Sequence, residues 1–358
     1  MASTTRLSAA ASNILGMTVG GGLADLRPTP RVLLDQGQNR SVSRLSLDGP
    51  AGAPIADSPT GPPVLLVPPL GVPTRCFDLR RGCSVAEYLL RQGHRTYLLD
   101  YGRMGFSDRW MGIEHFVRDV LPKAITVASE DAGGQPVRVV GWCLGGIFSV
   151  LTAADSADLP IDSVITVASP IDFRSIPLVA PLRPLVELAD GWPFTGAYRA
   201  VGHVPSTAVR WAFQLTGIHK HLTKPLTVLS NLDNRELLAQ IEAVERFTAE
   251  MVAFPGRTFG QIYHRLFRAN DLADGTLRLS NGVISLADVR IPVLVISGDR
   301  DWIAPQRAVH RMVDVLTGSP EIRYEVCPGG HLGVLAGRAA QDSAWPHIDA
   351  FLQSRNAA

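Results

Sequence analysis

The sequence of 358 residues lacks several features that would assign it to particular classes of protein. Its four cysteines form no C-x-x-C pair and no regular spacing, which argues against a zinc site or a disulfide framework and is typical of a reducing compartment. The formal net charge is +1 without a basic stripe, so nucleic acid is not the expected partner. No apolar run could span a bilayer, and no solid hydrophobic block precedes a cleavage site. These absences predict a cytoplasmic globular protein.

The most informative segment that is present reads Val-Gly-Trp-Cys-Leu-Gly-Gly over residues 140–146. It has the form of a nucleophile elbow, with Cys143 where most such elbows carry serine. Apolar residues 137–140 predict the strand before the elbow, and residues 147–154 are compatible with the helix after it. Free cysteine is also a common core residue, but a core cysteine would not need this glycine frame. We therefore expect Cys143 to be a nucleophile, and its acyl thioester would stay activated for transfer.

Short apolar runs alternate with helical stretches along much of the chain. This order predicts a mainly parallel sheet with helices on both faces. Ser84 and Glu87 have capping-box spacing at the start of one helix, which Gly93 can close. Alternating polar and apolar residues at 41–47 predict a half-buried edge strand. The further predicted strands are 64–67, 96–99, 137–140, 164–167, 292–296 and 322–326, and the further helices lie around 116–127, 309–316 and 345–352.

The interval 171–284 breaks this rhythm. It is rich in proline and aromatic residues, contains a helical run at 237–244 and shows no strong strand. We interpret it as a cap inserted after the sixth core strand, between core segments 31–170 and 285–358. Residues 1–30 read as a flexible arm with at most a short helix, either solvated or in contact with a partner or a lipid-like surface.

A nucleophilic cysteine needs a base, and the base needs an orienting group. His331 follows the strand at 322–327 within Pro-Gly-Gly-His-Leu-Gly, where glycines let a loop reach the elbow. Asp301 follows the strand at 293–296, four residues before a proline, and is the predicted orienting acid. Asp299 is its competitor, or else a turn-capping aspartate. The order nucleophile, acid, histidine is that of an α/β-hydrolase.

Backbone N–H groups should complete the site as an oxyanion hole. We expect one from Leu144, directly after the nucleophile, and one from the Pro-Pro-Leu-Gly-Val loop at 68–72, with Gly71 as the candidate. His219 and His221 have metal-like spacing in the cap, but no thiol or carboxylate companion is evident. The sequence therefore predicts no metal and no bound cofactor.

Together, the elbow cysteine, Asp301 and the Gly-Gly-His331 loop resemble the polyhydroxyalkanoate synthase family, in particular its short catalytic subunit. The resemblance covers roughly residues 27–353 and includes further segments at 78–79, 85–93, 169–173, 285–288 and 328–333. It implies an α/β-hydrolase fold, with Cys143 as the acyl-accepting nucleophile, His331 as its base and Asp301 as the third member. It also implies a 3-hydroxyacyl-coenzyme A substrate with coenzyme A as leaving group, a growing polyester, and a location at polyester granules. A non-catalytic second subunit or a homodimer would be the protein partner.

The chain departs from the family pattern at three places. Trp302 stands where the family has histidine, and Phe247 replaces a typical tryptophan of the cap. Residues 100–105 read Asp-Tyr-Gly-Arg-Met-Gly instead of Asp-Trp-Gly-x-Pro-Asp, and with residues 106–108 they look like the turn of ordinary hydrolases. Two alternatives therefore stay open: a cysteine thioesterase or esterase that releases free acid, and a non-catalytic relative that binds granules or a partner.

Overall fold

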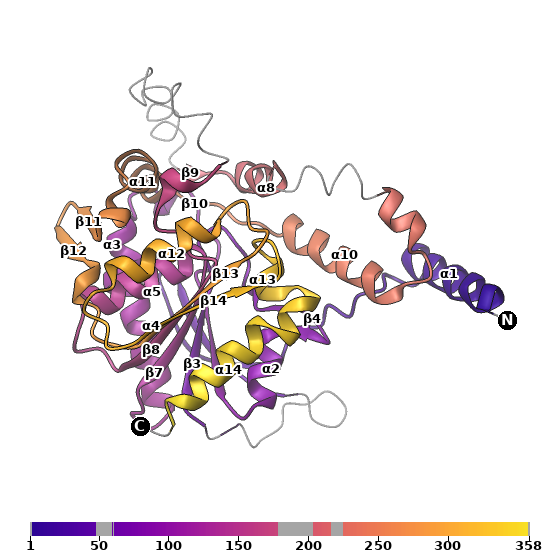
Figure 1. The fold of residues 1–358 in the computed structure, drawn as a ribbon, viewed down its shortest axis with the longest axis horizontal. Coiled ribbons are helices and arrows are strands. Elements are labelled where there is room, and N and C mark those ends of the chain that lie inside the picture. The colour runs from indigo at the N-terminus through magenta and orange to yellow at the C-terminus, as the bar shows by residue number, and fades with distance from the viewer. Residues whose placement is uncertain (1, 48–58, 60, 178–202, 216–224, 357–358) are drawn as a thin grey trace.

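The main sheet places the predicted strands side by side. The computed structural model describes residues 2–47, 59, 61–177, 203–215 and 225–356. Its eight-stranded sheet has the order β1-β2-β6-β3-β7-β8-β13-β14 (Figure 1). The strands from β6 to β14 in this order are parallel, and β2 pairs antiparallel with both β1 and β6. The strands are β1 (Arg31–Gly37), β2 (Arg40–Leu45), β3 (Pro63–Val67), β6 (Arg95–Asp100), β7 (Val137–Trp142), β8 (Ile161–Val167), β13 (Val293–Gly298) and β14 (Ile322–Cys327).

The N-terminal end of the sheet differs from the prediction in one respect. The predicted edge strand is β2, but it is not at the edge, because β1 forms a hairpin with it through a turn in which Asn39 has a φ of 50°. Most of β1 is exposed, including Val32 and Leu33, so its sequence lacks the alternation that a half-buried strand shows.

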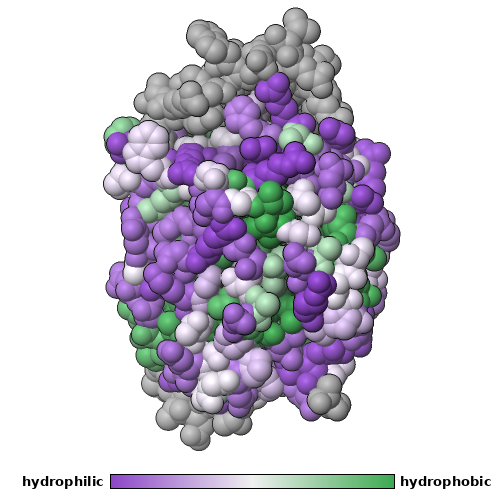
Figure 2. All heavy atoms as spheres, turned by 90° about the vertical axis from the view of Figure 1, so that its left-hand side faces the viewer, coloured by the Kyte–Doolittle hydropathy of each residue, from purple (hydrophilic) through white to green (hydrophobic). Residues whose placement is uncertain are grey.

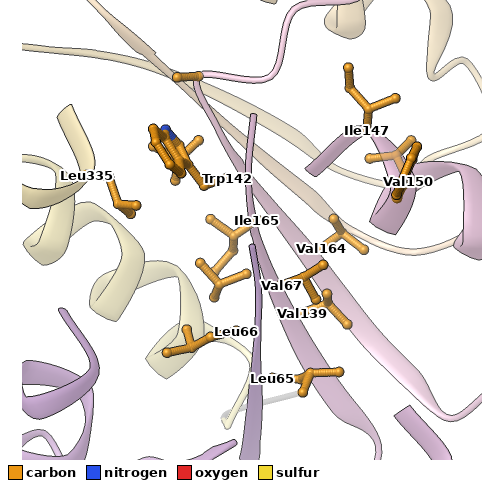
Figure 3. Close-up of a cluster of buried hydrophobic side chains, with 14 of the residues drawn as sticks. Leu65, Leu66, Val67, Val139, Trp142, Ile147, Val150, Val164, Ile165 and Leu335 are labelled. Atoms are coloured by element: carbon orange, nitrogen blue, oxygen red, sulfur yellow. The ribbon is translucent and has the colours of Figure 1, made fainter. Parts of the chain in front are cut away.

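Every residue of the two central strands, β3 and β7, is buried. Figure 3 shows that successive side chains point to opposite faces of the sheet, with Leu66 and Trp142 on the side of Leu335 and with Leu65 and Val139 on the other. A parallel sheet covered on both faces needs such continuous apolar strands.

The helices that cover the sheet agree with the predicted stretches. Ser84 caps α2, and its hydroxyl accepts from the Glu87 N–H at 3.0 Å. The helices of the core are α2 (Val85–Arg91), α3 (Ile113–His115), the π-helix η4 (Phe116–Val120), α4 (Leu121–Asp131), α5 (Leu144–Asp155), α12 (Gln306–Val315), α13 (Gly333–Ala336) and α14 (Ala344–Ser354). Short elements between them are η2 (Thr74–Cys76), β4 (Asp78–Arg80), β5 (Cys83–Ser84), η3 (Phe106–Asp108), η5 (Phe173–Ser175), η9 (Leu286–Asp288) and η10 (Arg338–Asp342).

The region predicted as a cap follows β8, which is the sixth strand of the main sheet in chain order. Contrary to the expectation of no strong strand, it contains two short antiparallel pairs, β9 with β10 and β11 with β12. Its described elements are β9 (His203–Val204), α8 (Ser206–Leu215), α10 (Arg235–Ala249), β10 (Phe254–Pro255), α11 (Gly256–Gln261), η7 (Ile262–Ala269), η8 (Asp271–Asp274), β11 (Thr276–Leu279) and β12 (Gly282–Ser285). His219 and His221 lie outside the described residues.

The N-terminal segment forms a helix, α1 (Ala2–Thr18), which is longer than the short helix expected in the arm. Its Asn13 amide donates to the Leu232 carbonyl at 2.7 Å, and Glu242 of α10 accepts from the N–H groups of Leu23 and Ala24. These contacts attach the segment to the region around α10 (Figure 1).

The surface over α3, β11 and β12 is mainly hydrophilic, with hydrophobic side chains in small groups (Figure 2). Within the part of the chain that the structure describes, no helix is long and apolar enough to cross a membrane. The same residues contain no group of three or more histidine, cysteine, aspartate or glutamate side chains placed to hold a metal ion.

Candidate active site

Cys143 occupies the sharp turn between β7 and α5. Its φ of 52° and ψ of −121° are strained for a residue with a side chain, and such strain is concentrated at functional sites. The turn is fixed by hydrogen bonds: the Cys143 N–H donates to the Val167 carbonyl at 2.8 Å, and the Cys143 carbonyl accepts from Gly146 and Ile147. The structure thus gives the predicted elbow its strand, its turn and its helix.

The glycines of the elbow are required by close packing. A Cβ atom on Gly141 would lie 2.5 Å from the Gly146 Cα, and one on Gly145 would lie 2.3 Å from the Val67 carbonyl oxygen. A Cβ atom on Gly146 would lie 2.2 Å from the Ser169 hydroxyl. Only hydrogen fits at these three positions without displacing backbone or buried side chains.

The loops after β13 and β14 bring Asp301 and His331 together. The His331 Nδ1 and Asp301 Oδ2 atoms lie 2.8 Å apart, and both side chains are buried. The second Asp301 oxygen accepts from the N–H groups of Ile303 and Ala304 at 2.8 and 2.9 Å. Because Nδ1 faces Asp301, Nε2 is left for Cys143.

The competing carboxylate, Asp299, has a different position. It accepts from the Gly329 N–H at 2.7 Å and pairs with Arg300 at the surface. This hydrogen bond to Gly329 lowers the pKa of the Asp299 carboxyl. Asp299 therefore caps the loop that carries the histidine, as the turn-capping alternative expects, and Asp301 contacts the ring.

The charges of the buried pair favour proton transfer from Cys143. Burial disfavours the imidazolium, but the Asp301 carboxylate and a hydrogen bond with Cys143 outweigh it and raise the pKa of His331 to about 10. Burial likewise opposes the charge on Asp301, yet His331 and the two backbone N–H groups hold the pKa of this carboxyl below its usual value. A histidine of such basicity accepts the proton of a neighbouring thiol readily.

The four cysteines differ in their exposure. Cys76, Cys83 and Cys327 are buried, whereas Cys143 is partly exposed. Burial raises the pKa of all three buried thiols, to about 11 for Cys327. Cys143 therefore combines access with a neighbouring base, which a reactive cysteine requires.

The two segments predicted to form the oxyanion hole pack against each other. Leu144 is the first residue of α5, where N–H groups have no acceptor within the helix. The loop 68–72 lies beside the elbow, because a Cβ atom on Gly145 would also meet the Pro68 carbonyl oxygen at 2.7 Å. Gly71 has a φ of 80°, and its carbonyl accepts from Val252 of the cap region at 3.0 Å. The donor roles of Leu144 and Gly71 stay predictions.

One residue that sequence reasoning did not single out contacts the histidine directly. Trp142, the last residue of β7, is fully buried, and its indole N–H donates to the His331 carbonyl at 3.1 Å. The sequence shows only a large residue at the variable position of the elbow, and nothing in it indicates this long-range contact.

The three departures from the family pattern have different surroundings. Trp302 is 69% exposed beside Asp301, whereas Phe247 is buried with its ring 6.4 Å from that of Trp142. Tyr101 is buried, and its hydroxyl has no hydrogen-bond partner within the described ranges. The substitutions therefore affect the surface and the packing around the site, and they leave Cys143, Asp301 and His331 in place.

Comparisons with known proteins agree with this fold. The sequence profile of the alpha/beta hydrolase fold family matches residues 62–337. The chain is 26% identical to the poly(3-hydroxyalkanoate) polymerase subunit PhaC of Allochromatium vinosum and 24% identical to that of Thiocystis violacea, over 86% of this chain and 84% of each relative. A thermostable carboxyl esterase from Bacillus coagulans has a similar fold, with 14% identity, a TM-score of 0.57 and coverage of 92% of this chain and 99% of the esterase. The chain thus belongs to the α/β-hydrolase fold family, and within this family it is similar to the PhaC polymerase subunits over most of its length.

Proposed function

We propose that this protein is an acyltransferase that polymerises 3-hydroxyacyl units from coenzyme A thioesters into a polyester. The observation that carries the proposal is the strained, partly exposed Cys143 beside the buried His331–Asp301 pair. The relatives named as poly(3-hydroxyalkanoate) polymerase subunits support the substrate class.

Acylation begins when His331 accepts the proton of the Cys143 thiol. The thiolate attacks the thioester carbonyl, and the N–H groups of Leu144 and Gly71 stabilise the oxyanion. The carbon–sulfur bond to coenzyme A then breaks, and coenzyme A leaves as a thiol with the proton from His331. Asp301 keeps the imidazole oriented and stabilises its positive charge.

Transfer then moves the acyl group from sulfur to oxygen. A hydroxyl of another monomer or chain gives its proton to His331 and attacks the Cys143 thioester. An ester bond forms, and Cys143 leaves as the thiolate and recovers its proton. The predicted cap, residues 171–284, would keep water away from the thioester during this exchange.

The same proposal covers partners and location. Relatives named as subunits support a second, non-catalytic subunit, and a homodimer is the alternative assembly. The product would be an insoluble polyester, so the surface of cytoplasmic polyester granules is the proposed site of action.

The test is to mix the purified chain, alone and with a co-encoded partner, with 3-hydroxybutyryl-coenzyme A. We expect release of free thiol together with insoluble polyester. The Cys143→Ala variant should lose thiol release by at least ~10³-fold, because the nucleophile is removed. Free 3-hydroxybutyrate as the sole product would contradict polymerisation and identify the protein as a thioesterase.

A further inference from the structure

Trp142 lies between the histidine loop and the helix α10. Its indole N–H donates to the His331 carbonyl at 3.1 Å, and its ring centroid is 5.1 Å from that of the imidazole. The Phe247 ring of α10 also contacts it, at 6.4 Å between centroids. All three side chains are buried. One residue of the elbow therefore contacts the catalytic base directly and α10 through Phe247.

The histidine needs support at its backbone. The loop before it is held at Gly329, whose N–H donates to Asp299 and whose carbonyl accepts from the Arg300 N–H at 3.0 Å, but these bonds do not reach His331 itself. Asp301 holds the ring through Nδ1 alone. The Trp142 bond fixes the backbone carbonyl of His331, and the indole ring packs against the imidazole, so Trp142 contacts both the backbone and the ring of the histidine.

A second contact ties α10 to the same loop. The Gln240 amide on α10 donates to the Ala336 carbonyl of α13 at 3.0 Å, and α13 begins two residues after His331. The helix α10 thus meets the histidine segment at His331 itself, through Phe247 and Trp142, and again at Ala336, through Gln240.

We propose that Trp142 is a positioning residue. It sets the orientation of His331 toward Cys143 and couples this orientation to the position of the helix α10. The proposal rests on the proposed roles of Cys143 and His331. A misplaced base costs rate and leaves substrate binding unaltered, because proton transfer depends steeply on geometry.

The test compares Trp142→Phe with Trp345→Phe. Trp345 serves as the matched control. It is also buried, and its indole N–H donates to a backbone carbonyl, that of Leu335, at 2.7 Å. Each variant therefore loses one buried N–H bond and keeps an aromatic ring. Circular dichroism confirms that each variant is folded before the kinetic comparison.

Two readouts separate positioning from packing: the kcat and KM of coenzyme A release, and the rate of Cys143 alkylation by iodoacetamide as a function of pH. For Trp142→Phe we expect kcat to fall about tenfold or more with KM unchanged. Half-maximal alkylation should move to higher pH, because a loosened imidazolium stabilises the thiolate less. Trp345→Phe should leave both readouts within about twofold of the wild type.

Equal effects of the two variants, or an unmoved alkylation profile in Trp142→Phe, would overturn the proposal. If Trp142→Phe does not fold, Phe247→Leu removes the ring contact alone, and we expect the same direction at about two- to fivefold. An unchanged kcat in Phe247→Leu would overturn the coupling to α10. If the wild type releases no coenzyme A, the proposed function fails, while the alkylation profiles still decide the role of Trp142.

Discussion

Two histidine–aspartate pairs are buried in the part of this protein that the structure describes, and they lie at opposite ends of the parallel strands. His331 and Asp301 follow the carboxyl ends of β14 and β13, with 2.8 Å between Nδ1 and Oδ2. His94 precedes β6 at the amino edge, and its Nε2 lies 2.7 Å from an oxygen of Asp349. The chemical groups and distances are almost the same, so pairing alone does not make an active site.

The surroundings distinguish the two pairs. His331 keeps Nε2 for a strained cysteine, whereas His94 uses Nε2 for Asp349 itself, whose other oxygen accepts from Gln353 of the same helix. Ligands of parallel α/β sheets bind outside the carboxyl ends of the strands, which is where the first pair lies. The pair at the carboxyl edge is therefore catalytic in our proposal, and the pair at the amino edge joins α14 to the core.

Replacing each histidine in turn gives the largest expected contrast. His331→Gln should lower kcat for coenzyme A release by about 10⁴-fold, because the thiol loses its base. His94→Gln should leave kcat within about twofold and lower the free energy of unfolding by about 1–3 kcal/mol, because a buried hydrogen bond is lost. Steady-state kinetics and urea titration measure both. Comparable kinetic losses in the two variants would remove the distinction.

Replacing the carboxylates should give a smaller contrast in the same direction. Asp301→Asn retains the shape and the backbone contacts but not the charge that orients His331, so we expect kcat to fall by about 10³-fold. In Asp349→Asn we expect kcat to change less than about twofold. A normal rate in Asp301→Asn would show that Asp301 does not support the base.

The pH dependence of stability gives the smallest effect. The pKa of His331 rises from an ordinary value of 6.5 to about 10 on folding, so its contribution is complete below pH 6.5 and is lost as the pH rises toward 10. Between about pH 7 and pH 9, the free energy of unfolding should fall by about 2–3 kcal/mol from this group. Urea titrations at several pH values give the free energy of unfolding of the wild type and of His331→Gln, and this free energy should fall more steeply with pH in the wild type. The same pH dependence in both proteins would contradict the raised pKa.

The sequence was most informative where backbone conformation dictates residue type. The elbow glycines are recognisable because no Cβ fits at Gly141 or Gly145, and the central strands because burial on both faces demands continuous apolar residues. The position of Asp301 before Pro305 also distinguished it from Asp299, which is closer in sequence to the strand but caps a loop.

Other features depend on contacts that sequence patterns do not encode. Trp142 and His331 are 189 residues apart in the sequence, so the motif that contains Trp142 gives no sign of their contact. β1 was missed because it is largely exposed and lacks the alternation of a half-buried strand. The helix α1 was underestimated because its stability includes contacts with the distant residues Leu232 and Glu242, which the local composition does not reveal.

Mass spectrometry of the protein after brief exposure to 3-hydroxybutyryl-coenzyme A tests the central claim most directly. We predict an adduct on Cys143 whose mass grows by successive hydroxybutyryl units, because a chain lengthened on the hydroxyl of a monomer is still a coenzyme A thioester and acylates Cys143 again. Cys83 and Cys327, which are buried, should remain unmodified in the same sample. Absence of an adduct on Cys143 while free thiol is released would contradict the role of this cysteine as the acyl carrier.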